Sequence, residues 1–155
     1  MISRLSKYPT TFASIAMKIE AQIRTYLDLL PDSKQGDMNQ LHQLILDLKP
    51  ESERWFLDGK DEAGKVVSNP NIGYGNHTIV YKDGSSKSFY KLGISANSSG
   101  ISMYVMGTPS KDYLNEKYGQ TLGKAKITGY CIKFKSLKDI NLDVLNALIC
   151  KELED

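Results

Sequence analysis

Cysteine and histidine are scarce in this 155-residue chain, and their positions exclude the common metal and redox motifs. The two cysteines, Cys131 and Cys150, form no Cys-x-x-Cys pair and have no histidine near them in the sequence. A zinc finger or a redox dithiol therefore has no support, and two lone thiols are typical of a protein in the reducing cytoplasm. His42 and His77 are the only histidines, and neither has a cysteine or carboxylate at ligand spacing.

The chain also lacks an excess of charge of one sign and a long apolar run. Lysine and arginine total 20 against 18 aspartates and glutamates, which gives a net charge of +2. Such a balance selects neither nucleic acid nor an acidic membrane as a partner. The apolar runs are far shorter than the roughly 20 residues of a membrane helix, and no secretory signal follows Arg4 and Lys7. We expect a cytoplasmic protein with no membrane partner and no nucleic-acid partner.

Apolar residues at steps of three and four predict helices toward both ends of the chain. The first predicted helix covers residues 12–30 and ends at Pro31. A second begins near Asp37, a favourable N-cap, and ends before Pro50. The last covers residues 137–154. The first two helices should form a hairpin.

Alternating and β-branched residues predict a sheet in the middle of the chain. Asp83 and Gly84 mark a hairpin turn between its first two strands. We therefore predict one α+β domain over residues 1–155, with an antiparallel sheet of four or slightly more strands and helices packed mainly on one face. The predicted strands are 72–81, 86–95, 100–106 and 129–134, the predicted loop is 51–71, and a short helix is predicted at 110–119.

Two motifs invite a nucleotide or RNA interpretation, and the pattern disfavours both. The stretch "GQTLGKAK" at 119–126 has three residues between its glycines and alanine after the lysine, so it is not a Walker loop. Lysines crowd residues 124–138 beside Tyr130 and Phe134. Strand alternation predicts Lys133 on the face opposite these two aromatic residues, so that a solvated sheet face is the better interpretation.

Three acidic residues in the predicted loop are the candidates for a metal site. Asp58, Asp61 and Glu62 could supply the oxygen ligands that suit calcium, magnesium or iron. The stretch "DGKDEAGK" lacks the ordered ligand positions of an EF-hand, and a solvated loop explains the same residues.

Four glycines lie in or beside the predicted strands, although glycine weakens a strand unless a bend or a close backbone approach requires it. They suggest a sheet that opens at one end into a concavity lined by tyrosines. Bends in a coiled sheet with core tyrosines explain the pattern equally well. The glycines are Gly73, Gly75, Gly93 and Gly100, and the tyrosines are Tyr74, Tyr81, Tyr90 and Tyr104.

Three stretches of the chain carry a resemblance to a known family: "IGYGNHTIVY" (72–81), "GISANSSGISMYVMG" (93–107) and "LGKAKITGYCIKFKSLKDINLDVLNALI" (122–149). Through them, from about residue 26 to residue 149, the chain resembles the YdhG-like domains of unknown function, a family that includes a proposed frataxin-like iron chaperone. The resemblance implies an α+β sandwich similar to that of frataxin, and it makes iron the one cofactor to consider.

One loop departs from the family pattern. Members of the family typically carry Gly-Phe-Ser-Pro-Arg-Lys where this chain has Gly-Ile-Ser-Ala-Asn-Ser at 93–98. If the two basic residues bind an anion elsewhere in the family, this chain should bind it weakly or not at all. Alternatively, the small side chains leave room for a neutral ligand or for the surface of a partner.

Three functional hypotheses follow. The first is an uncharacterised, non-enzymatic binding module for a small ligand or a protein partner. The second is an iron-binding chaperone that uses Asp58, Asp61 and Glu62. The third is an enzyme with His77 as general base, the less favoured class. The expected ligand lining of the binding module comprises Gly73, Tyr74, Gly75, His77, Gly93, Ser95 and Tyr104.

Overall fold

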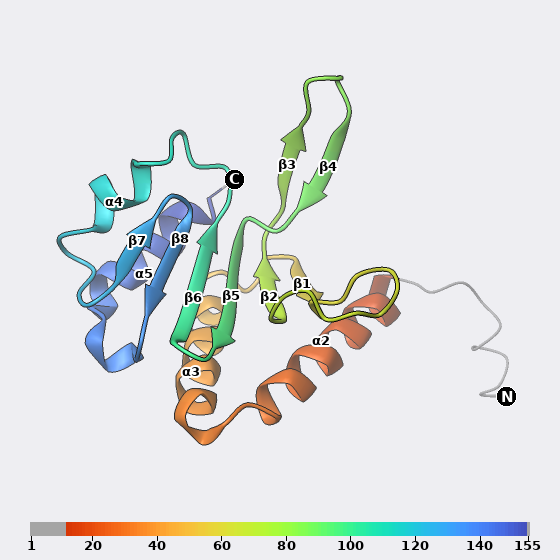
Figure 1. The fold of residues 1–155 in the computed structure, drawn as a ribbon, viewed down its shortest axis with the longest axis horizontal. Coiled ribbons are helices and arrows are strands. Elements are labelled where there is room, and N and C mark those ends of the chain that lie inside the picture. Colours follow the sequence, from red (N-terminus) through yellow and green to blue (C-terminus); the bar gives the residue numbers. More distant parts are fainter. Residues whose placement is uncertain (1–11, 155) are drawn as a thin grey trace, which may run out of the picture.

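A computed structural model describes residues 12–154, so that the positively charged N-terminal stretch lies outside the described part. No helix within residues 12–154 is long and apolar enough to cross a membrane. The elements in chain order are α2 (Phe12–Asp28), α3 (Asp32–Leu48), β1 (Arg54–Leu57), β2 (Asn71–Tyr74), β3 (His77–Val80), β4 (Ser86–Phe89), β5 (Leu92–Asn97), β6 (Gly100–Val105), α4 (Tyr113–Tyr118), β7 (Lys126–Thr128), β8 (Cys131–Phe134), the 3-10 turn η1 (Leu137–Asp139) and α5 (Leu142–Glu152) (Figure 1).

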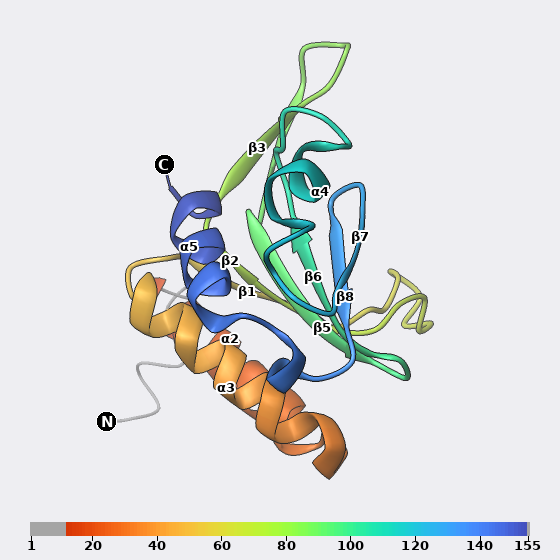
Figure 2. The same cartoon turned by 90° about the vertical axis from the view of Figure 1, so that its left-hand side faces the viewer.

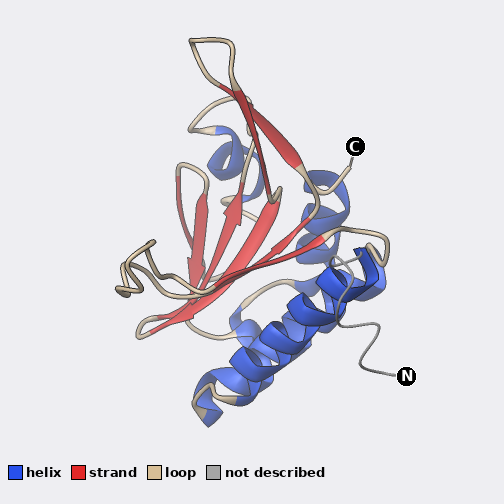
Figure 3. Cartoon of the chain, turned by 90° about the vertical axis from the view of Figure 1, so that its right-hand side faces the viewer, coloured by secondary structure: helices blue, strands red, loops and turns tan. Residues whose placement is uncertain are grey.

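Six strands form one antiparallel sheet in the order β1-β2-β5-β6-β8-β7. Helices α2, α3 and α5 lie together on one side of this sheet (Figures 2 and 3). Strands β3 and β4 pair only with each other and project beyond the sheet as a hairpin (Figure 1). The predicted α+β architecture, with an antiparallel sheet and helices mainly on one face, is confirmed, and the sheet has six strands where four or slightly more were predicted.

The hydrophobic core lies between the sheet and the helices. One row of residues crosses the sheet from Ile72 through Ile94 and Met103 to Ile132, and all four side chains are fully buried. Helices α3 and α5 cover this row with their own buried faces. Burial of each such side chain stabilises the fold by about 1.5–3 kcal/mol, so the row holds the central strands against the helices.

Several predicted boundaries were wrong, and glycine explains one of them. The predicted strand 72–81 is two strands, because Gly75 adopts a φ of +77° and turns the chain out of the sheet. The indole Nε1 of Trp55 donates to the carbonyl of Gly75 at 2.7 Å and fixes this turn. Trp55 itself belongs to β1, a strand within the predicted loop 51–71.

The second helix begins at Asp32 rather than near Asp37. Pro31 occupies the position before the first helical residue, where its fixed φ, here −58°, is already compatible with a helix start. Asp37 instead serves another element: its carboxylate accepts hydrogen bonds from the Ser136 hydroxyl at 3.2 Å and the Leu137 amide at 3.0 Å. Asp37 therefore caps η1 and not, as the sequence predicts, the helix in which it lies.

The ring of Tyr90 packs directly against the backbone of Gly73 and Gly93. The two glycines are direct cross-strand partners, and a Cβ on either would come within 2.5 Å of the Tyr90 side chain. Phe89 stacks on Tyr90 with ring centroids 4.2 Å apart, so the tyrosine cannot swing outward without displacing it. These two glycines are required for close packing of an aromatic ring, and Tyr90 fills the space above them.

We predict that Gly93→Ala lowers the free energy of unfolding by about 1–3 kcal/mol, because the new methyl group collides with the trapped ring. In a Tyr90→Ala background the same substitution should cost almost nothing. Urea denaturation of the four proteins gives the coupling. Gly36→Ala is the control, since a Cβ there meets nothing within 4 Å and removal of a helical glycine should stabilise by up to about 1 kcal/mol. Equal costs in the two backgrounds would contradict the packing explanation.

Candidate functional site

The sheet face that points away from α2, α3 and α5 is the candidate functional surface, and we call it the outer face. The register places Trp55, Gly73, Gly93, Tyr104 and Cys131 in one row across it. Segment 58–70 projects on this side of the sheet (Figure 2, yellow). The outer face therefore combines two glycines with aromatic side chains.

Five aromatic residues form a track across the outer face. Tyr130 lies at one end with its ring 6.4 Å from that of Tyr104. Tyr90 and Phe89 stack in the middle, and Phe89 reaches Trp55 at 6.1 Å. Tyr130 is 55% exposed, whereas Tyr90 is 4% exposed. The end near Tyr130 is therefore open to a ligand, and the middle is already filled.

Four of the seven expected lining residues meet on the outer face, namely Gly73, Gly93, Ser95 and Tyr104. Ser95 is fully buried there, and its hydroxyl donates to the Pro70 carbonyl at 2.6 Å. The hydroxyl of Tyr104 makes no hydrogen bond to another residue of the described chain, so it remains available to a ligand.

Tyr74 lies on the opposite, helix-covered face. Its side chain is fully buried, and its hydroxyl oxygen is 2.6 Å from Nδ1 of His42 on α3. Burial is the main cause of both pKa shifts: it raises the pKa of Tyr74 well above 10 and lowers the pKa of His42 to about 4. The imidazole is thus neutral and the phenol keeps its proton, so the pair is a neutral hydrogen bond in the core. The position of His42 beside Leu41 on the predicted second helix suggests a half-exposed surface residue, and this prediction is wrong, because the side chain is buried.

Gly75 and His77 lie outside the row of outer-face residues, at the end of the aromatic track where Gly75 bonds to Trp55 and His77 pairs with Phe89. Gly75 borders a hollow of about 590 Å³ formed with residues 48–53, Asn76 and Leu153. The imidazole of His77 packs against Gly107, where a Cβ would come within 2.7 Å of Cε1. No described residue hydrogen bonds to the His77 side chain, so the general-base hypothesis finds no partner for this imidazole.

The acidic loop residues are occupied by turns. The carboxylate of Asp58 accepts from the Lys60 amide at 2.9 Å, and that of Asp61 accepts from the Ala63 and Lys65 amides at 3.0 and 2.9 Å. Within residues 12–154 no group of three or more histidine, cysteine, aspartate or glutamate side chains is arranged to hold a metal ion. Asp58, Asp61 and Glu62 therefore do not assemble into the expected cation site.

The stretch of small residues after Gly93 is mostly strand rather than loop. Strand β5 continues to Asn97, and only Ser98 and Ser99 connect it to β6. Beside this turn lies a hollow of about 250 Å³, which we call the basic hollow because three lysines from β7, β8 and the end of β8 surround it. Its lining comprises Asn97, Ser99, Gly100, Ile101, Lys126, Lys133, Phe134 and Lys135.

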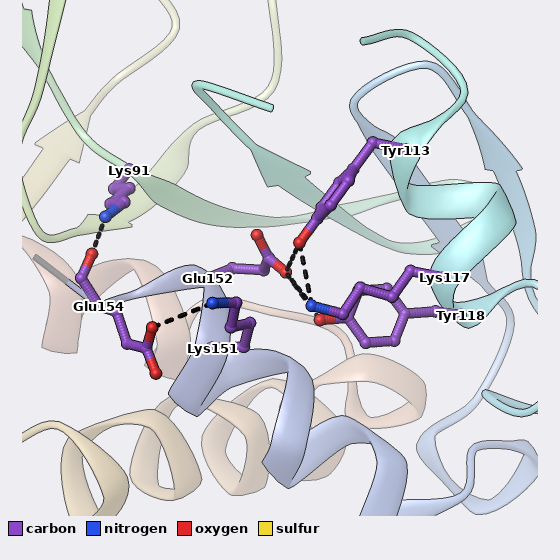
Figure 4. Close-up of polar contacts among 7 residues, drawn as sticks. All are labelled: Lys91, Tyr113, Lys117, Tyr118, Lys151, Glu152 and Glu154. Carbon is purple, nitrogen blue, oxygen red and sulfur yellow. Dashed lines mark hydrogen bonds and ion pairs between the residues drawn. The ribbon is translucent and has the colours of Figure 1, made fainter. Parts of the chain in front are cut away.

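A second polar cluster ties α4 to α5 (Figure 4). The hydroxyls of Tyr113 and Tyr118 donate to one carboxylate oxygen of Glu152 at 2.9 and 2.7 Å. Lys117 lies 3.9 Å from the same oxygen and 3.0 Å from the Tyr113 hydroxyl. Beside this cluster, Lys91 bonds to the Glu154 carbonyl near the end of the described chain. Glu152 is 10% exposed and has its partners within the protein, so this cluster is structural.

The sequence points to Tyr130 and to the lysines near it, but it does not predict that Tyr130 and Lys126 lie on the outer face. Strand alternation predicts Tyr130 on the face of Ile132 and Phe134, but Gly129 has a φ of +56° and Tyr130 precedes β8 in a turn. Its ring therefore joins Tyr104 on the outer face. Lys126 was not connected with Lys133, because the pairing of β7 with β8 is not visible in the sequence.

We predict that His42 makes the protein less stable in acid. Its folded pKa of about 4 lies below the unfolded value of 6.5, so the stability that its neutral form supports is complete above pH 6.5. That contribution falls as the pH drops from 6.5 to 4, by about 3 kcal/mol. The free energies of unfolding of the wild type and of His42→Asn, which keeps a hydrogen-bonding partner for Tyr74, are measured by urea denaturation, and their difference should change by this amount over the same pH range. Parallel pH profiles would contradict the buried-imidazole explanation.

Comparisons of the chain with family models, with curated proteins and with solved structures found no match. The resemblance to the YdhG-like domains therefore rests on the sequence motifs alone.

Proposed function

We propose that this chain is a cytoplasmic YdhG-like domain protein that acts as a non-enzymatic binding module, with the outer face as its binding surface. The observation that carries this proposal is the aromatic track at its open end. Tyr104 and Tyr130 present their rings on a sheet face that α2, α3 and α5 leave uncovered. Aromatic side chains combine a large apolar surface with a polar tip, which suits them to binding sites.

The polar groups of the outer face favour recognition over catalysis. The hydroxyls of Tyr104 and Tyr130 make no hydrogen bond within residues 12–154, so both can bond to a ligand. The face carries one thiol, Cys131, whose pKa is raised chiefly by burial. A thiol that stays protonated is a poor nucleophile. The ligand would thus be held by ring contacts and hydroxyl hydrogen bonds, with no covalent step.

A thermal-shift screen of the 155-residue protein tests this function. The panel comprises neutral metabolites, phosphorylated metabolites, ferrous iron and other divalent metals. A ligand present at 100 times its dissociation constant adds about 2.7 kcal/mol, which corresponds to a shift of about 5–10 °C for a chain of this size. We expect an organic compound to give such a shift, and Tyr130→Ala to abolish it.

Tyr81→Ala is the matched control, because Tyr81 is also exposed, at 47%, but lies in the β3–β4 hairpin. It should leave the ligand-induced shift unchanged. A shift that both variants retain would place binding elsewhere and contradict the proposal. A shift with ferrous iron alone would favour the iron-chaperone hypothesis instead.

A further inference from the structure

We propose that the outer face binds single-stranded nucleic acid, with the lysines of the basic hollow on the phosphates and Tyr104 and Tyr130 stacked on the bases. This inference rests on the proposed function, since it names the ligand class of the same surface. It reverses the expectation drawn from the net charge, and the reason is the position of Tyr130. Its ring lies beside Tyr104 on the outer face, which Lys133 shares by strand alternation.

Two of the lysines, Lys126 and Lys133, repel each other across the sheet, and a bound anion would offset this repulsion. Lys126 and Lys133 are direct cross-strand partners on the outer face. Like charges directly opposite one another destabilise a sheet. Lys135 adds a third positive charge to the same hollow, and its lining contains no acidic residue. None of the ion pairs found within residues 12–154 involves these three lysines. A phosphate bound between the ammonium groups of Lys126 and Lys133 would offset this repulsion.

The spacing of lysine and tyrosine rows fits a nucleotide. Lys133 pairs with Ser102, and two residues further along the strands Cys131 pairs with Tyr104. Two residues of a β-strand span about 7 Å. A phosphate at the lysine row therefore leaves its base within reach of the tyrosine row. Aromatic stacking beside a positively charged groove is the usual arrangement for single strands, since every base has a face that can stack.

The shape of the surface favours a strand over a small phosphorylated molecule. At about 250 Å³ the basic hollow is smaller than the pockets of roughly 300–1,000 Å³ that enclose small ligands. The aromatic track also continues past Tyr90 to Phe89, where Nζ of Lys87 lies 5.8 Å from the ring centroid. A positive charge thus also lies beside the middle of the track. In a duplex the neighbouring base pairs cover the base faces on which Tyr104 and Tyr130 can stack, which disfavours a duplex.

Fluorescence anisotropy with labelled 12-nucleotide oligouridylate and oligothymidylate tests the inference on the 155-residue protein. We expect binding of at least one oligonucleotide in 50 mM salt. Three phosphate contacts predict that affinity falls about 20-fold between 50 and 200 mM salt. Lys126→Gln, Lys133→Gln and Lys135→Gln together should remove most of the binding and of its salt dependence. Tyr130→Ala should weaken binding about 5- to 150-fold, the effect of losing one stacked base.

Matched variants separate this site from general charge effects. Lys18→Gln, Lys82→Gln and Lys111→Gln together remove the same charge from exposed positions outside the hollow and should change affinity less than threefold. Tyr81→Ala should leave affinity unchanged. Absence of binding to both oligonucleotides in 50 mM salt overturns the inference. The inference is also overturned if polyphosphate binds as tightly as the oligonucleotides and Tyr130→Ala does not weaken oligonucleotide binding, because the surface would then recognise charge alone.

The outcomes also distinguish the inference from the function on which it rests. Uridine monophosphate is added as a competitor at a concentration equal to the dissociation constant of the oligonucleotide. If it displaces the oligonucleotide at this concentration, the ligand is a small nucleotide and the single-strand inference is overturned. If oligonucleotides do not bind but another compound shifts the melting temperature in a Tyr130-dependent way, the binding function stands and the nucleic-acid inference fails. If the oligonucleotides do not bind and no compound gives a Tyr130-dependent shift, the binding function and the nucleic-acid inference both fail.

Discussion

The contact of the Tyr90 ring with Gly73 and Gly93 is the constraint on which the centre of the sheet depends. The ring lies where the chain returns from the hairpin to β5, so one side chain closes the junction between the two sheets. A side chain at either glycine would lift the ring and separate it from Phe89. The exposed side chains of the outer face, including Tyr104 and Tyr130, therefore lie beside a tightly packed group formed by Tyr90, Gly73 and Gly93.

The sequence predicted the helix-covered face of the protein better than the outer face. Helical periodicity and strand alternation depend on burial against a core, and β6 and α5 follow these patterns with few exceptions. Strand β1 was missed because its four residues are all half-buried and show no alternation. His42 has the spacing of a core residue with Met38 and Ile45, so a stricter reading of the helical period would have placed it correctly.

The outer face depends on pairing between distant segments, and this is why its residues could not be assembled from the sequence. Gly73 and Gly93 were recognised as unusual, but nothing local indicates that Tyr90 covers both. Charge misled for a related reason. Residues 124–138 contain five lysines and no acidic residue, so all 18 aspartates and glutamates of the chain lie elsewhere. A sum over the chain hides this local excess of positive charge.

The hairpin has a consequence for how this fold can vary. Below it the amide of Lys91 donates to the Tyr74 carbonyl at 3.0 Å, so β2 and β5 remain joined whatever lies between them. Most of residues 76–88 are exposed, and β3 and β4 pair with no other strand of the described chain. Evolution or engineering can therefore lengthen, shorten or exchange the hairpin tip as an independent cassette without changing the scaffold underneath.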